Sequence, residues 1–467
     1  MFDFKKWATK AVDWSADYFD SIRDRPVRPN IAPGSVSEKL PASPPEGPED
    51  VATIFEDFEK IILPGMTHWQ HPRFFAYFPA NSSPPSVVAE YLTATLSAQC
   101  MLWQTSPAAT ELEIVTMNWL RQAIALPGTF TGVIQDSASS ATLCAILTMR
   151  ERTLDWQGNT KGLGQGPILR IYTSSHAHSS IDKAVRIAGL GEDNLVKLPV
   201  HGDHYKVDPE ALDAAIREDV ANGFVPAGIV AVTGATSIGA SDDINAICDV
   251  AERHNLYVHV DAAWAGSAMI CPEFRSFFAG AERADSITFN PHKWMGVNFD
   301  CCAHFVRAPE DLVRTLAIQP EFLKTQGRND VINFSEWSVP LGRRFRALKL
   351  WFVIRAYGLE GLREIIRNHV SWSQELAQQI DETEDFELVT KPILSLFSFR
   401  FAPADTGDLD GLNEELLNRI NSDGRIYLTQ TRHDGAFVIR FQAGQFQATR
   451  DDVQFAWKVI QEIARTL

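Results

Sequence analysis

The spacing of hydrophobic positions changes along the chain, and each spacing predicts a different element. In residues 1–20 the apolar and aromatic positions recur about every three to four residues, which predicts an amphipathic helix with an aromatic face. Short β-branched runs at 168–173, 228–234 and 256–263 are bounded by turn-forming residues and predict strands buried on both faces of a sheet. Residues 243–254 have a helical pattern, which favours a strand–helix–strand crossover and a mostly parallel sheet.

These changes of pattern divide the chain into three regions. Residues 1–83 combine the aromatic helix with a proline-rich connector, and we expect an N-terminal helical segment that packs on a partner subunit. Residues 84–350 alternate helices with short apolar strands, which is typical of a large α/β domain. Residues 351–467 return to helix and then give two alternating strands around a further helix, which predicts a smaller α+β domain.

The composition narrows the classes of partner. The 467 residues carry a formal net charge of −16, and an acidic surface repels both nucleic acid and anionic membrane. We therefore expect a small molecule or a second copy as partner, with no nucleic acid, no membrane and no metal. The six cysteines are scattered without a C-x-x-C pair, and no segment reads as a signal peptide or a membrane span. These features favour a cytoplasmic location.

A lysine at the end of a predicted strand is the first candidate for chemistry. In DSITFNPHKW (285–294) the strand runs directly into Asn290, Pro291, His292 and Lys293. An amine beside a histidine and two aromatic residues can be held partly desolvated, which lowers its pKa towards the free base that attacks an aldehyde. Without such a context, a lysine is normally a solvated surface residue.

An aspartate at the end of a second strand supplies a matching group. HVDAAWAG (259–266) places Asp261 after a β-branched run, and the small residues that follow let a planar group approach the backbone. A carboxylate there can keep a pyridine nitrogen protonated, which is what makes a pyridoxal ring an electron sink. Taken alone, an aspartate at a strand end is more often a helix cap or a turn former.

A serine-rich turn can hold the phosphate of such a cofactor. GVIQDSASSATLCAIL (132–147) leads from a short strand through Ser137, Ala138 and Ser139 into an apolar helix. The free N–H groups, the hydroxyls and the positive end of the helix dipole converge there on an anion, and Asn290 can add a side-chain donor. An ordinary serine-capped helix is the plainer interpretation of this motif in isolation.

Two weaker motifs lie at other strand ends. HAHSS (176–180) offers a histidine that could stack on the exposed face of the cofactor, although both histidines could equally be structural. In TGATS (233–237), Thr236 can hydrogen-bond the ring or the nearby aspartate. Each motif is moderate evidence, but their order along an α/β chain predicts pyridoxal 5′-phosphate as the cofactor.

Several longer segments resemble one enzyme family. HPRFFAYFPA, SPAATELE, HVDAAWAGSA, FNPHKW, VNFDC and PLGRRFRALKLWF together resemble the group II aromatic L-amino-acid decarboxylases, and the resemblance covers nearly the whole chain. It implies the α/β fold of the fold type I pyridoxal-phosphate-dependent transferases. It also implies a tight homodimer, in which the N-terminal helices of one subunit lie across the other.

The resemblance implies a role for each matching residue. Lys293 would form the Schiff base with the cofactor, Asp261 would pair with the pyridine nitrogen, and His178 would stack on the ring. The residues expected at the phosphate and around the ring are Ser137, Ala138, Ser139, Asn290, Thr236 and His292. The residues expected around the aromatic group of the substrate are Trp69, Tyr77, Phe78, Pro79, Met101 and Gly342, where glycine would permit an indole side chain.

The implied reaction is decarboxylation of phenylalanine, tyrosine, dopa or tryptophan, through a quinonoid carbanion, to the arylalkylamine and CO2. In decarboxylating members a loop tyrosine protonates that carbon, but QPEFLKTQGRND (319–330) has Phe322 at this position, and a phenyl ring has no proton to donate. Phenylalanine there resembles the aromatic acetaldehyde synthases, in which dioxygen intercepts the carbanion and gives aldehyde, CO2, ammonia and hydrogen peroxide. Protonation by water or His178 would still give the amine, so both products stay open.

Two other classes share part of the pattern. A transaminase would share the fold and Lys293, but many transaminases place an aromatic residue where a stacking histidine is expected here. A cofactor-binding regulator without activity would be expected to lack Lys293 or Asp261, and this chain has both.

Overall fold

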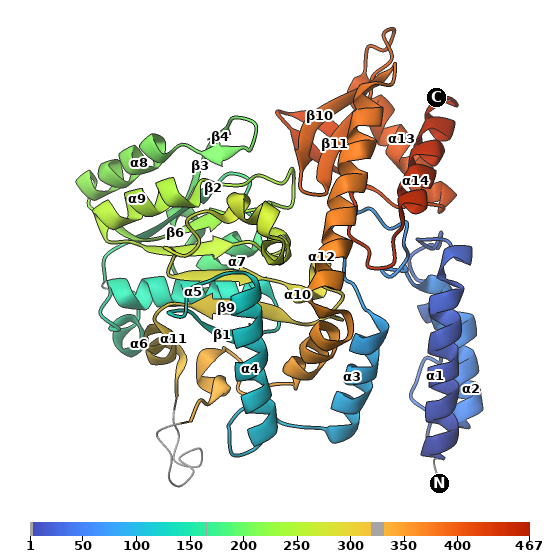
Figure 1. Ribbon diagram of the computed structural model, residues 1–467, viewed down its shortest axis with the longest axis horizontal. Helices are drawn as coiled ribbons and strands as arrows, with labels where there is room; N and C mark the ends of the chain where they lie inside the picture. Colours follow the sequence, from blue (N-terminus) through green and yellow to red (C-terminus); the bar gives the residue numbers. More distant parts are fainter. Residues whose placement is uncertain (1–2, 165, 319–330) are drawn as a thin grey trace. The chain divides into compact units, whose positions relative to one another are not determined.

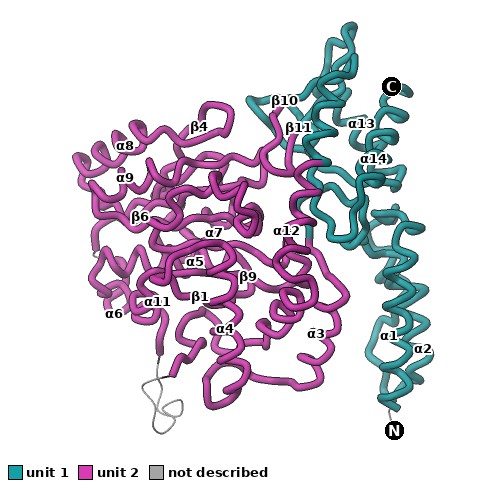
Figure 2. The backbone as a smooth tube through the Cα atoms, viewed as in Figure 1, with its two compact units in different colours: residues 1–79, 372–389, 398–467 teal, residues 80–371, 390–397 magenta. Residues whose placement is uncertain are grey.

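The computed structural model describes residues 3–164, 166–318 and 331–467. The chain divides into two compact units, which Figure 2 colours separately. Unit 1 comprises residues 1–79, 372–389 and 398–467, and unit 2 comprises residues 80–371 and 390–397. The three domain ranges expected from the sequence stay a prediction.

The centre of unit 2 is a sheet that, within the described residues, has seven strands in the order β1-β9-β8-β7-β6-β2-β3 (Figure 1). Strands β3, β2, β6, β7 and β8 run parallel, whereas β9 is antiparallel to both β8 and β1. The predicted mostly parallel sheet is confirmed. Its strands are β1 (Thr131–Gln135), β2 (Leu169–Ser174), β3 (Leu195–Leu198), β6 (Val225–Val232), β7 (Tyr257–Asp261), β8 (Ser286–Phe289) and β9 (Cys302–Val306).

The helix between β6 and β7 is the crossover predicted for residues 243–254. Helix α9 (Ile244–His254) begins at Asp243, whose carboxylate accepts a hydrogen bond from the N–H of Ala246, and it ends at Asn255 in the left-handed conformation. It packs on β6 and β7. Helix α5 (Ala138–Thr153) packs on the five adjacent strands β1, β9, β8, β7 and β6. This cover explains why the strands are apolar on both faces.

The other helices of unit 2 surround this sheet. They are α3 (Pro84–Leu96), α4 (Pro107–Ala123), α6 (Gly158–Lys161), α7 (Ser180–Ile187), α8 (Pro209–Ala221), α10 (Pro291–Trp294), α11 (Pro309–Leu316) and the first part of α12 (Arg346–Asp381). Across the described ranges, none of the helices has both the length and the apolar character that a membrane crossing requires.

Unit 1 holds the N-terminal helices and most of the C-terminal α+β region. Helix α1 (Phe4–Asp20) confirms the predicted aromatic helix, and Trp7 stacks on Phe55 of α2 (Val51–Asp57). The second sheet of the described chain has the order β10-β11-β13-β12. Its strands are β10 (Phe386–Ile393), β11 (Leu396–Phe401), β12 (Thr429–His433) and β13 (Ala436–Gln442), and the helices are α13 (Leu409–Asp423) and α14 (Arg450–Ala464).

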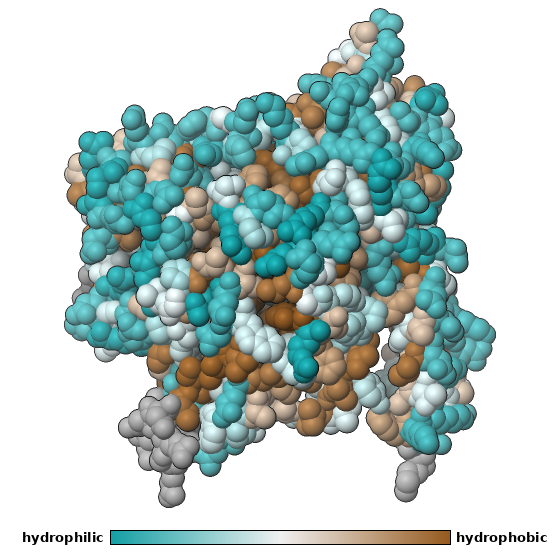
Figure 3. All heavy atoms as spheres, in the orientation of Figure 1, coloured by the Kyte–Doolittle hydropathy of each residue, from teal (hydrophilic) through white to brown (hydrophobic). Residues whose placement is uncertain are grey.

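Apolar side chains gather on part of the surface of unit 2. Figure 3 shows them in the region where Figure 1 draws α4. The large apolar side chains that are exposed on α3 and α4 are here termed the α3–α4 apolar patch. They are Val88, Tyr91, Leu92, Leu96, Val115 and Trp119. Exposed apolar patches of this kind mark contact surfaces for other molecules.

Two histidines lie in the core between the sheet and its helices. His259 on β7 and His304 on β9 are fully buried, with their ring centroids 5.9 Å apart. His259 bonds the hydroxyls of Thr142 and Ser286. Burial lowers the pKa of His304 to about 4 and holds the pKa of His259 well below its usual range. Both rings are therefore neutral in the folded protein at neutral pH.

The low pKa of His304 predicts a loss of stability in acid. A histidine in the unfolded chain titrates near pH 6.5, so the folded state loses stability as the pH falls from there towards 4, by up to roughly 3 kcal/mol for this residue. We expect His304→Leu to remove this contribution, so that the variant gains about 1 kcal/mol relative to the wild type between pH 7.5 and pH 5.5. Urea unfolding at both pH values measures the difference, with His201→Leu on the exposed surface as control. An equal difference at both pH values would contradict the prediction.

Candidate active site

The carboxyl ends of β7 and β8 bring the predicted lysine and aspartate into one region of unit 2. Asp261 is the last residue of β7 and lies opposite Thr288 of β8 in the parallel register. Beyond the strands, the N–H of Asn290 donates to the carbonyl of Ala263 at 2.8 Å, so the two loops stay joined. Helix α10, which carries Lys293, begins directly after Asn290.

Lys293 and Asp261 influence each other's charge. Burial lowers the pKa of the Lys293 amine, and the negative charge of Asp261 opposes that shift. Burial raises the pKa of Asp261, whereas Lys293 and a hydrogen bond from the N–H of Ala263, at 3.1 Å, lower it. A desolvated amine near a buried carboxylate is the pair that the sequence predicted, and it can react with a carbonyl group.

The start of α5 lies beside the loop after β8. Ser137 is the N-cap residue, and its hydroxyl accepts a hydrogen bond from the N–H of Ser140 at 3.3 Å. The N–H of Ala138 donates to the side-chain oxygen of Asn290 at 3.1 Å, although the two residues are 152 positions apart. Ser139 is exposed in the first turn. The structure thus gathers the four residues predicted for the phosphate at one helix N-terminus.

His178 lies within electrostatic range of the pair. Its ring Nδ1 accepts a hydrogen bond from the N–H of Ser180 at 3.1 Å, which orients the imidazole. Partial desolvation lowers the pKa of His178, the charge of Asp261 raises it, and the charge of Lys293 lowers it. His178 itself is exposed.

His292 and Thr236 support the same loops. The Nδ1 atom of His292 accepts a hydrogen bond from the N–H of Cys301 at 2.9 Å, and burial lowers the pKa of His292 to about 3. Thr236 is half-buried in the turn after β6, where the N–H of Thr233 donates to the carbonyl of Asp261 at 2.9 Å. The turn that carries Thr236 is therefore tied to the strand end that carries Asp261.

The predicted substrate residues belong to both units. Trp69, Tyr77, Phe78 and Pro79 lie in unit 1, where Trp69 and Tyr77 are exposed and their rings stack with centroids 5.8 Å apart. Their approach to Lys293 stays a prediction. Met101 and Gly342 lie in unit 2. Phe322 lies outside the described residues, so its predicted role also stays a prediction.

Gly342 lines a cavity of about 390 Å³ in unit 2. The side-chain oxygen of Gln99 accepts a hydrogen bond from the N–H of Arg343 at 2.7 Å, and a Cβ atom on Gly342 would lie 3.2 Å from the Gln99 amide nitrogen. The buried guanidinium of Arg343 pairs with Glu113 at 2.8 Å. This buried pair fixes the backbone on which Gly342 lies.

Sequence reasoning missed Asn81. This buried side chain donates to the carbonyl of Lys293 at 2.8 Å, and the N–H of Asn81 donates to the carbonyl of His292 at 3.2 Å. Asn81 follows the segment FFAYFPA, which the sequence related only to the substrate. A contact across 212 positions leaves no local signal, so only the folded structure could identify it.

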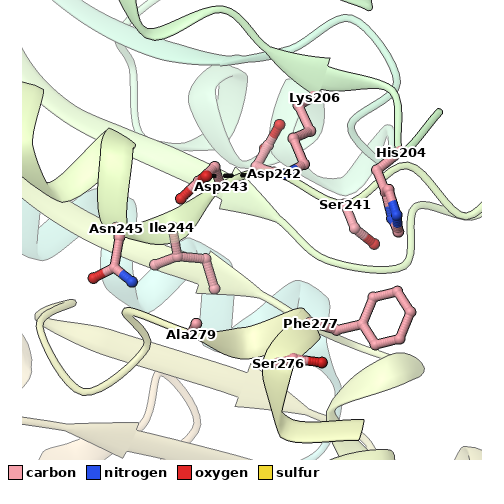
Figure 4. Close-up of a pocket in the computed structure, with 10 residues that line it drawn as sticks. All are labelled: His204, Lys206, Ser241, Asp242, Asp243, Ile244, Asn245, Ser276, Phe277 and Ala279. Carbon is pink, nitrogen blue, oxygen red and sulfur yellow. Dashed lines mark ion pairs between the residues drawn. The ribbon is translucent and has the colours of Figure 1, made fainter. Parts of the chain in front are cut away.

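A second cavity of unit 2, of about 490 Å³, lies at the start of α9 (Figure 4). Its walls include His204, Lys206, Asp242 and Asp243, and the amine of Lys206 lies 3.8 Å from the Asp243 carboxylate. Burial raises the pKa of Asp242 to about 6, although two backbone N–H groups donate to it. The residues that line this cavity include none of the predicted cofactor residues.

The residues at the ends of β7 and β8 fit pyridoxal 5′-phosphate. The cofactor needs an amine for its aldehyde, a carboxylate for its pyridine nitrogen and donors for its phosphate. Lys293 is partly desolvated, Asp261 is buried nearby, and Ser137 caps a helix whose first turn lies beside Asn290. These residues supply all three kinds of group that the cofactor needs.

Comparison with known proteins agrees with this chemistry. Residues 33–402 match the family described as "Pyridoxal-dependent decarboxylase conserved domain". The chain is 40% identical over 479 residues to the aromatic-L-amino-acid decarboxylase of Sus scrofa, covering 100% of this chain and 97% of that protein. It is 39% identical over 469 residues to the phenylacetaldehyde synthase of Arabidopsis thaliana, covering 98% and 94%.

A solved structure agrees over nearly the whole fold. The crystal structure of Oryza sativa TDC with PLP and tryptamine superposes with a TM-score of 0.96 at 36% identity, covering 99% of this chain and 98% of that one. Fold type I, predicted from the resemblance, is confirmed. The chain therefore belongs to the pyridoxal-dependent decarboxylase family, as a carboxy-lyase of the group that includes aromatic amino-acid decarboxylases and aldehyde synthases, with pyridoxal 5′-phosphate as its cofactor.

Proposed function

We propose that the enzyme removes the α-carboxylate of an aromatic L-amino acid at the carboxyl ends of β7 and β8. The observation that carries the proposal is the pair of Lys293 and Asp261, which have opposite charges. Burial shifts the pKa of each towards the neutral form, and the charge of each partner counteracts the shift of the other. When bound, the cofactor supplies an electron sink for the bond that breaks. The substrate would be phenylalanine, tyrosine, dopa or tryptophan.

The protein's own residues have separate tasks in this proposal. Lys293 holds the cofactor covalently, and its low pKa keeps part of the amine in the reactive neutral form. Asp261 keeps its charge beside the pyridine nitrogen. Ser137, Ala138, Ser139 and Asn290 bind the phosphate, which fixes the ring relative to both. His178 covers one face of the ring, and Thr236 and His292 support the loops around it.

The aromatic specificity rests on unit 1 and on Gly342. Of the four residues expected in unit 1, Trp69 and Tyr77 offer exposed rings that can stack on a substrate ring, whereas Phe78 and Pro79 are buried. Glycine at 342 leaves space for a large ring, but the Gln99 amide lies close to that space. A similar structure solved with tryptamine and a relative named phenylacetaldehyde synthase support aromatic side chains of both sizes.

The product depends on what protonates the α-carbon. Phe322 has no proton to donate, which favours the alternative function, an aldehyde synthase that consumes dioxygen. Water or His178 could instead deliver the proton and give the amine. Incubation with each aromatic amino acid, with amine, aldehyde, CO2 and peroxide quantified together, tests both products. Peroxide equal to CO2 would identify the aldehyde route, and amino transfer to a keto acid would contradict both.

Substitution of Phe322 by tyrosine is expected to raise the ratio of amine to aldehyde. A positioned general acid accelerates proton transfer by about 10²–10⁴-fold, so we expect the ratio to rise at least about tenfold. Phe322→Leu is the matched control, because it changes the ring without adding a proton donor. If Phe322→Tyr and Phe322→Leu give the same product mixture, residue 322 does not control the product.

The active unit in this proposal is a homodimer. The α3–α4 apolar patch gives unit 2 a surface that a second copy can cover, and burial of such side chains stabilises association.

The six cysteines are all buried free thiols in the described chain, and the reducing compartment expected from the sequence stays a prediction.

A further inference from the structure

Two stacked tryptophans join the loops that carry Lys293 and Asp261. Trp264 lies three residues after Asp261, and Trp294 directly follows Lys293. Their ring centroids are 4.9 Å apart with an interplanar angle of 22°. Both side chains are fully buried. The stack therefore links the loop after β7 to the loop after β8.

A third loop packs on the same stack. Gly234, in the turn that carries Thr236, has a positive φ of 77°. A Cβ atom on Gly234 would lie 3.1 Å from the ring of Trp264 and 2.5 Å from the Cβ atom of Ala265. Only glycine allows the turn to approach the ring this closely. The loops after β6, β7 and β8 thus share one aromatic contact.

His369 of α12 holds the second ring of the stack. The Nε1–H of Trp294 donates to the Nδ1 atom of His369 at 2.9 Å, and the two rings are within 9° of parallel. His369 is 1% exposed. A hydrogen bond between buried side chains is stronger than one in water, because the local dielectric constant is low. It fixes the orientation of the indole next to Lys293 from a separate, long helix.

We propose that His369 is a positioning residue, which acts through Trp294 to hold Lys293 at a fixed place relative to Asp261 and the turn of Thr236. His369 does not need to touch the cofactor for this role. A displacement of about 1 Å can cost on the order of 10²-fold in rate, so the orientation of the residue next to Lys293 matters. The proposal rests on the proposed covalent attachment at Lys293.

Leucine and asparagine at position 369 provide the test. The two side chains have nearly the same shape, but only asparagine presents an acceptor where the Nδ1 atom lies. In the holoenzyme we measure the dissociation rate of pyridoxal phosphate, the pH midpoint of its visible absorbance, and kcat and KM. We expect His369→Leu to raise the dissociation rate and to lower kcat by about tenfold or more with KM little changed, and to shift the midpoint. We expect His369→Asn to stay within about twofold of the wild type.

Trp294→Phe supplies a second route to the same hydrogen bond. Phenylalanine keeps a stacking ring but has no N–H, so it should reproduce the effects of His369→Leu. Because both changes remove one interaction, the double variant should be no worse than either single variant. This comparison also answers the question if His369→Leu does not fold.

The outcomes separate this proposal from the assignment of Lys293. Suppose that borohydride reduction labels Lys293 in every variant. If His369→Leu, His369→Asn and the wild type then share one pH midpoint and one dissociation rate, the positioning role is wrong. Equal losses for leucine and asparagine would also overturn it, because they would indicate packing alone. A label on another residue in the wild type would instead overturn the assignment of Lys293.

Discussion

Lys293→Ala is expected to lower kcat/KM by at least about 10⁴-fold and to abolish covalent attachment of the cofactor. Alanine has no amine. Of the two side chains whose charge lowers the pKa of Asp261, the change removes Lys293, which has the larger effect, and leaves His178, which has the smaller one. Incubation with pyridoxal phosphate, borohydride reduction and peptide mapping measure the attachment directly. In the wild type the label should lie on the peptide that contains Lys293.

Lys349 is the matched control for this experiment. It is 1% exposed, its amine lies 3.1 Å from the Glu90 carboxylate, and burial lowers its pKa to about 8. Lys349 is thus a second buried lysine with a reactive pKa, but it follows no strand of the sheet. Lys349→Met should keep the label on Lys293. A label on Lys349 in the wild type would contradict the assignment and would show that a low pKa alone selects the reactive lysine.

Asp261→Asn is expected to lower kcat/KM by about 10³-fold, or roughly 4 kcal/mol of transition-state stabilisation. Asparagine keeps the size of the side chain but is neutral, so it cannot hold a pyridine nitrogen protonated and no longer opposes the low pKa of Lys293. Steady-state kinetics measure the loss, and titration with pyridoxal phosphate shows whether the variant still binds the cofactor.

Asp261→Glu keeps the charge but moves it by one methylene group, and it should be less impaired than Asp261→Asn. The carboxylate of Asp261 also accepts the N–H of Ala263, so thermal unfolding of both variants checks that the loop is intact. An Asp261→Asn variant with the catalytic rate of the wild type would exclude the proposed role of the carboxylate.

Much of the fold follows from local sequence patterns. The runs at 228–234 and 256–263 correspond to β6 and β7, and the helical pattern between them corresponds to α9. These elements were predictable because the period of the apolar residues, the cap at Asp243 and the left-handed Asn255 act within a few positions of the chain.

The candidate site was predictable only as a set of residue types at strand ends. Parallel strands place their carboxyl ends at one edge, so Asp261 and Lys293 could be expected to meet there. The assignments of Phe322 and of the aromatic residues in unit 1 rest on the resemblance alone. No periodicity or turn signal relates those positions to the cofactor.

The sequence by itself determined the aromatic N-terminal helix, several strands of the large sheet with the helix at 243–254, and which side chains could bind or activate a pyridoxal ring, because those properties depend on neighbours within one or two turns of chain. Only the tertiary structure decided that Asn81 holds the carbonyl of Lys293, that Ala138 meets Asn290, and that His369 bonds Trp294. Each of these contacts joins residues at least 75 positions apart. Such contacts depend on strand order and on how helices pack over the sheet, and no local pattern of hydrophobic and polar residues encodes that geometry.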